Sequence, residues 1–159
     1  MLKLISKKLK ILAPIDGRTT ELNAVPDPVF AEKMAGDGIA IDSSGNIAAA
    51  PVDGILSLVF RTNHAFGITL DNGIELLVHI GIDTVELEGE GFERIAEEGK
   101  SVKAGEPIIK IDREFIKGKG FSLITPVLIT NMDIVKAMKC HINKMVIGGS
   151  DEVINYKLK

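Results

Sequence analysis

The chain has 159 residues, 45% of them hydrophobic, a size and composition that suit one globular domain with a sizeable core. Its net charge of −3 and its lack of tryptophan exclude a broadly basic, aromatic-rich surface, so we expect no nucleic-acid partner. The single cysteine, Cys140, excludes an internal disulfide and a cysteine-based zinc cluster, and it favours a reducing, cytoplasmic location. No apolar run approaches the length of a membrane-spanning helix, about 18 residues.

Residues 1–9 interleave lysines with Leu2, Leu4, Ile5 and Leu9. The segment has neither the uninterrupted apolar stretch nor the small-residue cleavage site of a signal peptide. It is typical of a frayed terminus, and a weak contact of this basic arm with anionic lipid is the alternative. We therefore expect a flexible arm over residues 1–9 and a single domain over residues 10–159.

Short apolar or alternating runs, separated by glycines and prolines, follow along the chain. They cover residues 8–14, 38–51, 54–60, 65–82, 107–115 and 126–131, and are typical of strands in a β-sandwich or barrel. Helical patterning is limited to residues 26–36 and 131–140, the second with Asn131 as a candidate N-cap. The sequence therefore predicts an all-β fold with one or two short helices.

An internal repeat refines this fold prediction. Ala-Pro-x-Asp-Gly occurs at residues 13–17 and again at 50–54, each copy joining a proline with fixed φ to an Asp-Gly turn. A third segment, residues 97–112, has the glycine and valine spacing seen in lipoyl and biotinyl carrier domains. We expect an antiparallel β-sandwich or barrel of the duplicated hybrid-motif type.

The stretch Leu-Leu-Val-His-Ile-Gly-Ile-Asp, residues 76–83, places His79 in an apolar run, where a histidine is most often a hydrogen-bonded core residue. Asp71-Asn72-Gly73 predicts a type I′ hairpin turn between the run after His64 and the run ending at His79. Residue 64 then lies opposite a position near 80, so the two histidines become cross-strand neighbours. Two facing imidazoles pack poorly, and this favours a functional pair.

Two chemistries suit such a pair. A catalytic zinc site needs three protein ligands, and the His-x-His pattern of related metallopeptidase barrels is absent around His79. We therefore require no metal, although His64 and His79 could bind zinc adventitiously. Phosphoryl transfer needs one nucleophilic imidazole and a second donor for the phosphoryl oxygens. The carbonyl of Gly81 can hold the other nitrogen of the His79 ring, and Thr62 can orient His64, so the sequence fits phosphoryl transfer better.

Two features near the C-terminus receive other interpretations. Residues 137–140, Ala-Met-Lys-Cys, resemble a biotin acceptor, but such lysines lie at hairpin turns. Lys139 instead ends the helical pattern, so we do not expect biotinylation. His141, beyond the same pattern, is interpreted as a cation at a helix C-terminus.

With the two histidines placed, longer stretches become informative: VPDPVFAEKMAGDGIAI (25–41), APVDG (50–54), TNHAFGI (62–68), ELLVHIGIDTVELEGEGF (75–92) and TPVLITNMD (125–133). Together they resemble the glucose-family enzyme IIA of the bacterial phosphoenolpyruvate-dependent sugar phosphotransferase system, from about residue 10 to the C-terminus. The resemblance implies a cytoplasmic phosphotransferase component without a cofactor. His79 would accept a phosphoryl group from phospho-HPr and pass it to a cysteine of enzyme IIB. His64 would stabilise the group, while Thr62 and Gly81 orient the two rings.

The resemblance also suggests how partners dock. We expect an apolar collar around the histidines, made by Val29, Phe30, Phe60, Phe66 and Val85. Asp27 and Asp83 would meet basic side chains of the partners. Leu77 and Ile80 flank the Val-His pair and make the collar more aliphatic than in many members, and Phe92, Phe115 and Phe121 are assigned to the core.

The sequence also allows two other functions. In some bacteria, proteins of this family act chiefly as regulators, whose phosphorylation state decides which targets they bind. A zinc metallohydrolase on a related barrel is the less favoured alternative.

Overall fold

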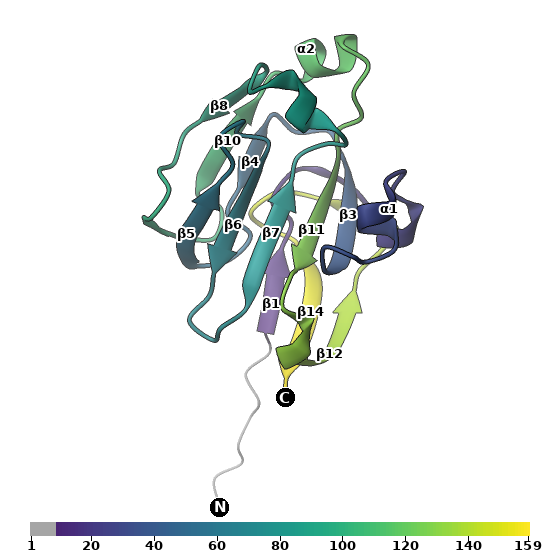
Figure 1. The fold of residues 1–159 in the computed structure, drawn as a ribbon. Helices are drawn as coiled ribbons and strands as arrows, with labels where there is room; N and C mark the ends of the chain where they lie inside the picture. The colour runs from purple at the N-terminus through teal and green to yellow at the C-terminus, as the bar shows by residue number, and fades with distance from the viewer. Residues whose placement is uncertain (1–8) are drawn as a thin grey trace, which may run out of the picture.

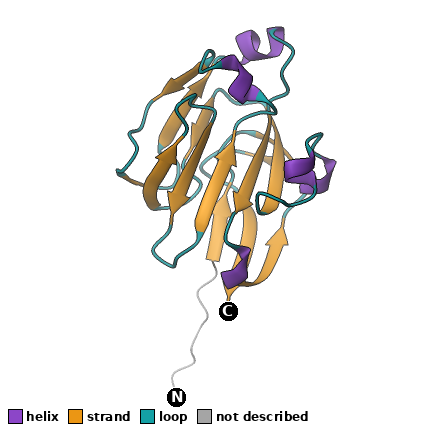
Figure 2. Ribbon diagram, viewed as in Figure 1, coloured by secondary structure: helices purple, strands orange, loops and turns teal. Residues whose placement is uncertain are grey.

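The computed structural model describes residues 9–159, so the arm expected over residues 1–9 lies outside the described region except for Leu9. The described residues form antiparallel sheets that enclose the core, with short helices at their margins (Figures 1 and 2). An eight-stranded sheet has the order β13-β2-β3-β11-β7-β6-β5-β9, and two three-stranded sheets have the orders β1-β14-β12 and β4-β10-β8. The all-β prediction is confirmed.

The bounds of the elements are as follows. The strands are β1 (Leu9–Leu12), β2 (Gly17–Glu21), β3 (Asp37–Ser43), β4 (Ile47–Ala49), β5 (Gly54–Val59), β6 (Ala65–Thr69), β7 (Glu75–His79), β8 (Phe92–Arg94), β9 (Ser101–Val102), β10 (Pro107–Ile111), β11 (Ile124–Ile129), β12 (Val135–Cys140), β13 (Met145–Val146) and β14 (Glu152–Leu158). The helices are α1 (Pro28–Ala31) and α2 (Arg113–Gly118), with single 3-10 turns η1 (Leu22–Ala24), η2 (Thr84–Leu87) and η3 (Met132–Ile134). Within residues 9–159, no helix has the length and apolar character needed to cross a membrane.

The two Ala-Pro-x-Asp-Gly copies occupy equivalent places in the large sheet. Gly17 begins β2 and pairs with Val146 of the edge strand β13, while Gly54 begins β5 and pairs with Val102 of the opposite edge strand β9. The two turns also bond to each other, since the N–H of Leu12 donates to the carbonyl of Pro51 and that of Ala49 to Pro14. The duplicated motif predicted from the repeat is therefore present in the architecture.

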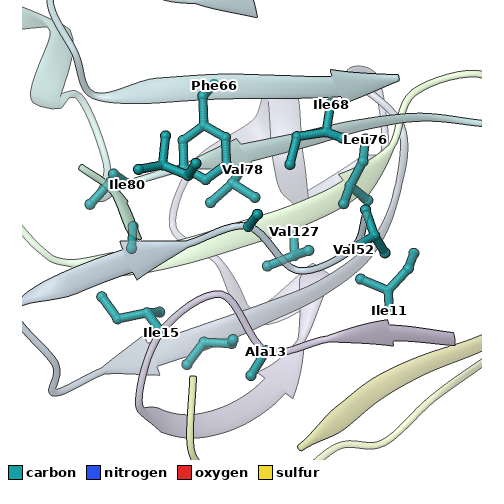
Figure 3. Packing of buried hydrophobic residues seen from close by; sticks show 14 of the residues in the cluster. Ile11, Ala13, Ile15, Val52, Phe66, Ile68, Leu76, Val78, Ile80 and Val127 are labelled. Atoms are coloured by element: carbon teal, nitrogen blue, oxygen red, sulfur yellow. The ribbon is translucent and has the colours of Figure 1, made fainter. Parts of the chain in front are cut away.

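The core lies between the sheets and consists mainly of branched aliphatic side chains. Figure 3 shows part of it, with side chains from well-separated segments packed together: Ile11, Ala13, Ile15, Val52, Phe66, Ile68, Leu76, Val78, Ile80 and Val127. All of them are buried, and burial of this apolar surface is the main force that holds the sheets against one another.

Strands β6 and β7 form the predicted hairpin and lie side by side in Figure 1. The turn differs from the prediction, because among Asp71, Asn72 and Gly73 only Gly73 has a positive φ, at 93°. The Asn72 side chain accepts a hydrogen bond from the N–H of Ile74 and donates one to the Tyr156 hydroxyl. This local bond suits a type I turn followed by a left-handed glycine, which replaces the type I′ turn.

The first predicted helix, over residues 26–36, is present but covers fewer residues than predicted. Helix α1 spans Pro28–Ala31 and begins at Asp27, whose carboxylate accepts from the N–H of Val29 at 2.9 Å. Proline at its first position suits the fixed φ of a helix start. The turn ends near Lys33, which has a left-handed φ of 59°.

The second predicted helix, over residues 131–140, is wrong. Only η3 is helical there, and Val135–Cys140 is strand β12, which pairs with β14. The Asn131 side chain does not cap η3, because it bonds the backbone of Glu75 and Gly73 at the β6–β7 hairpin. Lys139 therefore lies within a strand, paired with Asn155.

His141 follows strand β12, so its interpretation as a helix-terminal cation is also wrong, and its ring bonds the side chain of Asn155. Helix α2 was not predicted. It begins at Asp112, whose carboxylate accepts from the N–H of Phe115, within a segment interpreted as a strand through residue 115.

Candidate active site

The two histidines meet at one end of the β6–β7 hairpin. His79 is the last residue of β7 and pairs with Ala65, the first residue of β6, which His64 precedes. The N–H of Ile80 donates to the carbonyl of His64 at 2.7 Å, which fixes the backbone of both segments. The ring centroids of His64 and His79 lie 4.9 Å apart, with the ring planes at 82°. The predicted cross-strand neighbourhood is therefore confirmed.

The His79 ring is held in one tautomer by its Nδ1 atom, which lies 2.7 Å from the carbonyl oxygen of Gly81. A carbonyl only accepts hydrogen bonds, so Nδ1 carries the proton and the neutral ring keeps its lone pair on Nε2. Gly81 has a φ of +84°, and a Cβ there would lie 2.6 Å from Thr84 Cγ2 and 2.7 Å from the carbonyl of Ser122. Glycine is therefore needed to aim this carbonyl at the ring.

Thr84 is a contributor to the site that the sequence did not single out. It is fully buried, and its hydroxyl donates to the carbonyl of Ile80 at 2.6 Å, across the bend that contains Gly81. The N–H of Ile82 donates to the Ser122 carbonyl in the same bend. A threonine directly after the His-Ile-Gly-Ile-Asp stretch was the available signal, because threonine hydroxyls commonly bond a carbonyl four residues earlier.

His64 is oriented by the residue expected for that task. The hydroxyl of Thr62 lies 2.6 Å from His64 Nδ1. When this hydroxyl donates, the proton of the neutral His64 ring resides on Nε2, where it is available as a hydrogen-bond donor at the site. Between them, Asn63 adopts a left-handed φ of 59°, which asparagine tolerates better than most residues.

Burial keeps both imidazoles neutral. His64 is only 2% exposed, and its pKa falls to about 4 because desolvation, and then the neighbouring His79, disfavour its charged form. The pKa of His79 is also lowered by burial, although the Gly81 carbonyl, Asp27 and Asp83 partly oppose this shift. A neutral His79 with a free Nε2 lone pair is a nucleophile, which a protonated ring is not.

The structure separates the expected collar into exposed and buried members. Val29 is 46% exposed and Val85 is 50% exposed, so both side chains are available to a partner. Phe60 is half-buried with its ring centroid 5.2 Å from that of His64, and the buried Phe30 packs 4.8 Å from the His79 ring. These two phenylalanines therefore form walls for the imidazoles.

Phe66 does not belong with them, since its side chain is fully buried in the core (Figure 3), and we remove it from the collar. In β6 it faces inward, because alternate residues of a strand point to opposite sides. Ile80 is likewise fully buried and cannot make the exposed collar more aliphatic, whereas Leu77 is half-buried and packs against the cluster that contains Phe30. Phe92, Phe115 and Phe121 pack in or against the core, as expected.

The two expected acidic residues lie near the His79 ring and are differently exposed. Asp27 is half-buried at the start of α1, and Asp83 is exposed at the start of η2. Both act electrostatically on His79. Within residues 9–159, no group of three or more His, Cys, Asp or Glu side chains is placed to hold a metal ion, so this region gives the zinc-hydrolase alternative no third ligand.

Comparisons with known proteins agree with this geometry. Residues 9–135 match the family model described as phosphoenolpyruvate-dependent sugar phosphotransferase system, EIIA 1. A glucose-specific EIIA component of Bacillus cereus is 45% identical over 94% of this chain and 90% of its own length, and one of Haemophilus influenzae is 46% identical over 91% and 87%. The solved structure of glucose permease IIA from Mycoplasma capricolum superposes with a TM-score of 0.88 at 39% identity, covering 96% of this chain and 99% of that chain. The chain therefore belongs to the EIIA 1 family of the phosphoenolpyruvate-dependent sugar phosphotransferase system.

Proposed function

We propose that this chain is a phosphocarrier that receives a phosphoryl group from phospho-HPr on Nε2 of His79 and passes it to a cysteine of enzyme IIB during sugar uptake. The observation that carries this proposal is the bond between His79 Nδ1 and the Gly81 carbonyl, beside the His64 ring. Relatives more than 40% identical bear glucose-specific names, so glucose is the sugar we assign.

In the first step, the Nε2 lone pair of neutral His79 attacks the phosphorus atom of phospho-HPr. A new N–P bond forms at His79 while the N–P bond to the HPr imidazole breaks, and that imidazole leaves with the electron pair. His79 Nδ1 keeps its proton on the Gly81 carbonyl throughout. Once the group is on His79 it lies beside His64, whose Nε2–H, oriented by Thr62, stabilises the charge on the phosphoryl oxygens for onward transfer.

In the second step, a cysteine thiolate of enzyme IIB attacks the same phosphorus atom, and the His79 ring leaves as the neutral imidazole from which it began. Both steps need a partner seated over the pair. The exposed Val29 and Val85 provide apolar contact, and Asp27 and Asp83 provide charge for basic partner side chains. A seated partner also excludes water, which would otherwise hydrolyse the phosphohistidine.

The proposal includes the domain organisation and the location of the protein. We assign residues 10–159 to one EIIA domain, because all three sheets contribute to the main buried cluster. We assign the chain to the cytoplasm because its proposed partners are HPr and enzyme IIB.

Phosphorylation of the purified protein tests the proposal. The protein is mixed with phosphoenolpyruvate, enzyme I and HPr, and its intact mass should increase by one phosphoryl group that is acid-labile and alkali-stable. His79→Ala should lose this increase. His141→Ala, at a histidine in contact with Asn155, should retain it. Stable phosphate on the His79→Ala protein would contradict the assignment.

A further inference from the structure

The loop that carries His64 is held from outside by a short segment, residues 94–98, which we call the strap. Strand β5 leads into this loop, and its pairing with edge strand β9 covers Gly54 and Ile55. Further along β5, the N–H of Leu56 donates to the Lys100 carbonyl and the N–H of Gly99 to the Leu56 carbonyl. The chain next to the strap therefore continues along the same edge of β5.

At the end of β5, side chains of the strap replace a neighbouring strand. The carboxylate of Glu98 accepts from the N–H of Val59 at 2.8 Å, and Arg94 Nη2 donates to the carbonyl of Phe60 at 3.2 Å. The strap is itself fixed on strand β10, because the N–H of Ile95 donates to the Ile108 carbonyl. The last residues of β5 and the first of the loop are thus tied to the central strand of the β4-β10-β8 sheet.

Arg94 also reaches into the loop. Its Nε donates to the Oδ1 atom of Asn63 at 2.9 Å. Asn63 is the left-handed residue between Thr62 and His64, and its N–H donates to the same Phe60 carbonyl that Arg94 bonds. One guanidinium therefore fixes both ends of the bend that sets Thr62 against the His64 ring.

We propose that Arg94 and Glu98 are positioning residues for His64, which hold the loop so that Thr62 bonds Nδ1 and the Nε2–H group faces the phosphoryl site. The inference rests on the proposed function for its kinetic consequence. The four bonds made by the two side chains and Asn63 involve neither imidazole, so the strap acts through the loop. Because Arg94 is exposed, we expect its replacement by alanine to leave the core intact.

The strap should matter more for one step of transfer than for the other. His79 is held by Gly81 and strand β7, which the strap does not bond, so acceptance from phospho-HPr should change less than 2-fold, roughly the scatter of surface substitutions. Transfer to the enzyme IIB cysteine depends on His64. It should slow about 5-fold in Arg94→Ala, because the released loop then loses the one hydrogen bond by which Thr62 orients the His64 ring.

Two independent measurements test the proposal on the whole chain. The first is the imidazole ¹⁵N NMR spectrum of the unphosphorylated protein, which reports the His64 tautomer without any transfer reaction. The second is the pair of rates for acceptance and onward transfer. The variants are Arg94→Ala, Glu98→Ala and Glu98→Gln, because glutamine keeps an oxygen that accepts from Val59. The matched control is Arg18→Ala, at an exposed arginine on β2 near the opposite edge of the sheet.

In the expected result, Arg94→Ala and Glu98→Ala mix the His64 tautomers and slow onward transfer, while Glu98→Gln and Arg18→Ala resemble the wild type. Unchanged His64 signals in Arg94→Ala overturn the proposal, even if transfer slows, because Arg94 would then act on the partner. Mixed tautomers with a normal onward rate overturn it as well. If the wild type accepts no phosphate, the proposed function fails, and the NMR result alone still decides whether the strap positions His64.

Discussion

Replacing Gly81 with alanine tests whether the orientation of His79 depends on this one backbone position. The substitution keeps every functional side chain and adds a single methyl group. That group meets Thr84 Cγ2 at 2.6 Å and the Ser122 carbonyl at 2.7 Å, both well inside ordinary contact distance. Because Thr84 is fully buried and Ser122 contributes backbone, neither atom can move aside as a flexible surface side chain does.

The cost has two parts. Alanine at a φ of +84° is strained by about 1–2 kcal/mol. Forcing an extra methyl group into a well-packed site adds about 1–3 kcal/mol. We therefore expect the free energy of unfolding to fall by about 2–5 kcal/mol. The carbonyl that holds His79 Nδ1 should also be displaced, so phosphorylation should slow by at least about 5-fold, the loss of one hydrogen bond.

Gly120 provides a matched control, because it has a φ of +91° and no atom within 4 Å of its added Cβ. Gly120→Ala should show only the conformational cost of about 1–2 kcal/mol, with a normal phosphorylation rate. Urea unfolding and the rate of phosphate uptake from phospho-HPr measure both quantities. If Gly81→Ala matches Gly120→Ala in stability and in rate, the reasoning about the Gly81 carbonyl is refuted.

Three further predictions follow from the site. Thr62→Val removes the hydroxyl that bonds His64 while keeping its shape, so onward transfer measured by rapid quench should slow about 5-fold, and an unchanged rate would show that this bond is dispensable. Stability should fall as the pH drops from 6.5 toward 4, because the unfolded chain protonates the His64 imidazole while the folded one, whose pKa is lowered to about 4, does not. Urea unfolding at about pH 7 and about pH 5 should show a smaller loss in His64→Gln than in the wild type, and equal losses would exclude His64 as the cause. Val85→Asp should raise the KM for phospho-HPr about 5- to 10-fold without lowering the Tm, whereas Ile147→Asp, at a 62% exposed residue beside the distant edge strand β13, should change neither.

The histidine pair could be predicted from the sequence because everything that places it is local. Asp71-Asn72-Gly73 defines one hairpin, and the alternation of its strands then sets His64 opposite residue 80. Thr62 and Gly81 each lie two residues from the ring that they orient. The predicted turn type was wrong because the Asn72 side chain bonds the N–H of Ile74 and the hydroxyl of Tyr156. Tyr156 is distant in sequence, so no local pattern indicates that bond.

The errors concern features that only long-range contacts decide. Residues 135–140 carry apolar spacing that suits a helix, but pairing with β14 makes them a strand. Phe66 lies in the same short stretch as His64, yet it points into the core. Arg94 is 31 residues from Asn63, so no local pattern indicates that it holds the His64 loop.

We propose that His79 carries phosphate on Nε2 because the Gly81 carbonyl holds Nδ1. The most direct measurement is ¹H–¹⁵N NMR of the phosphorylated protein with labelled histidines, in which coupling to phosphorus identifies the modified ring nitrogen. We expect coupling at Nε2 of His79, with a protonated Nδ1 still bonded to the Gly81 carbonyl. Phosphate on Nδ1, or on His64 in the stable product, would contradict it.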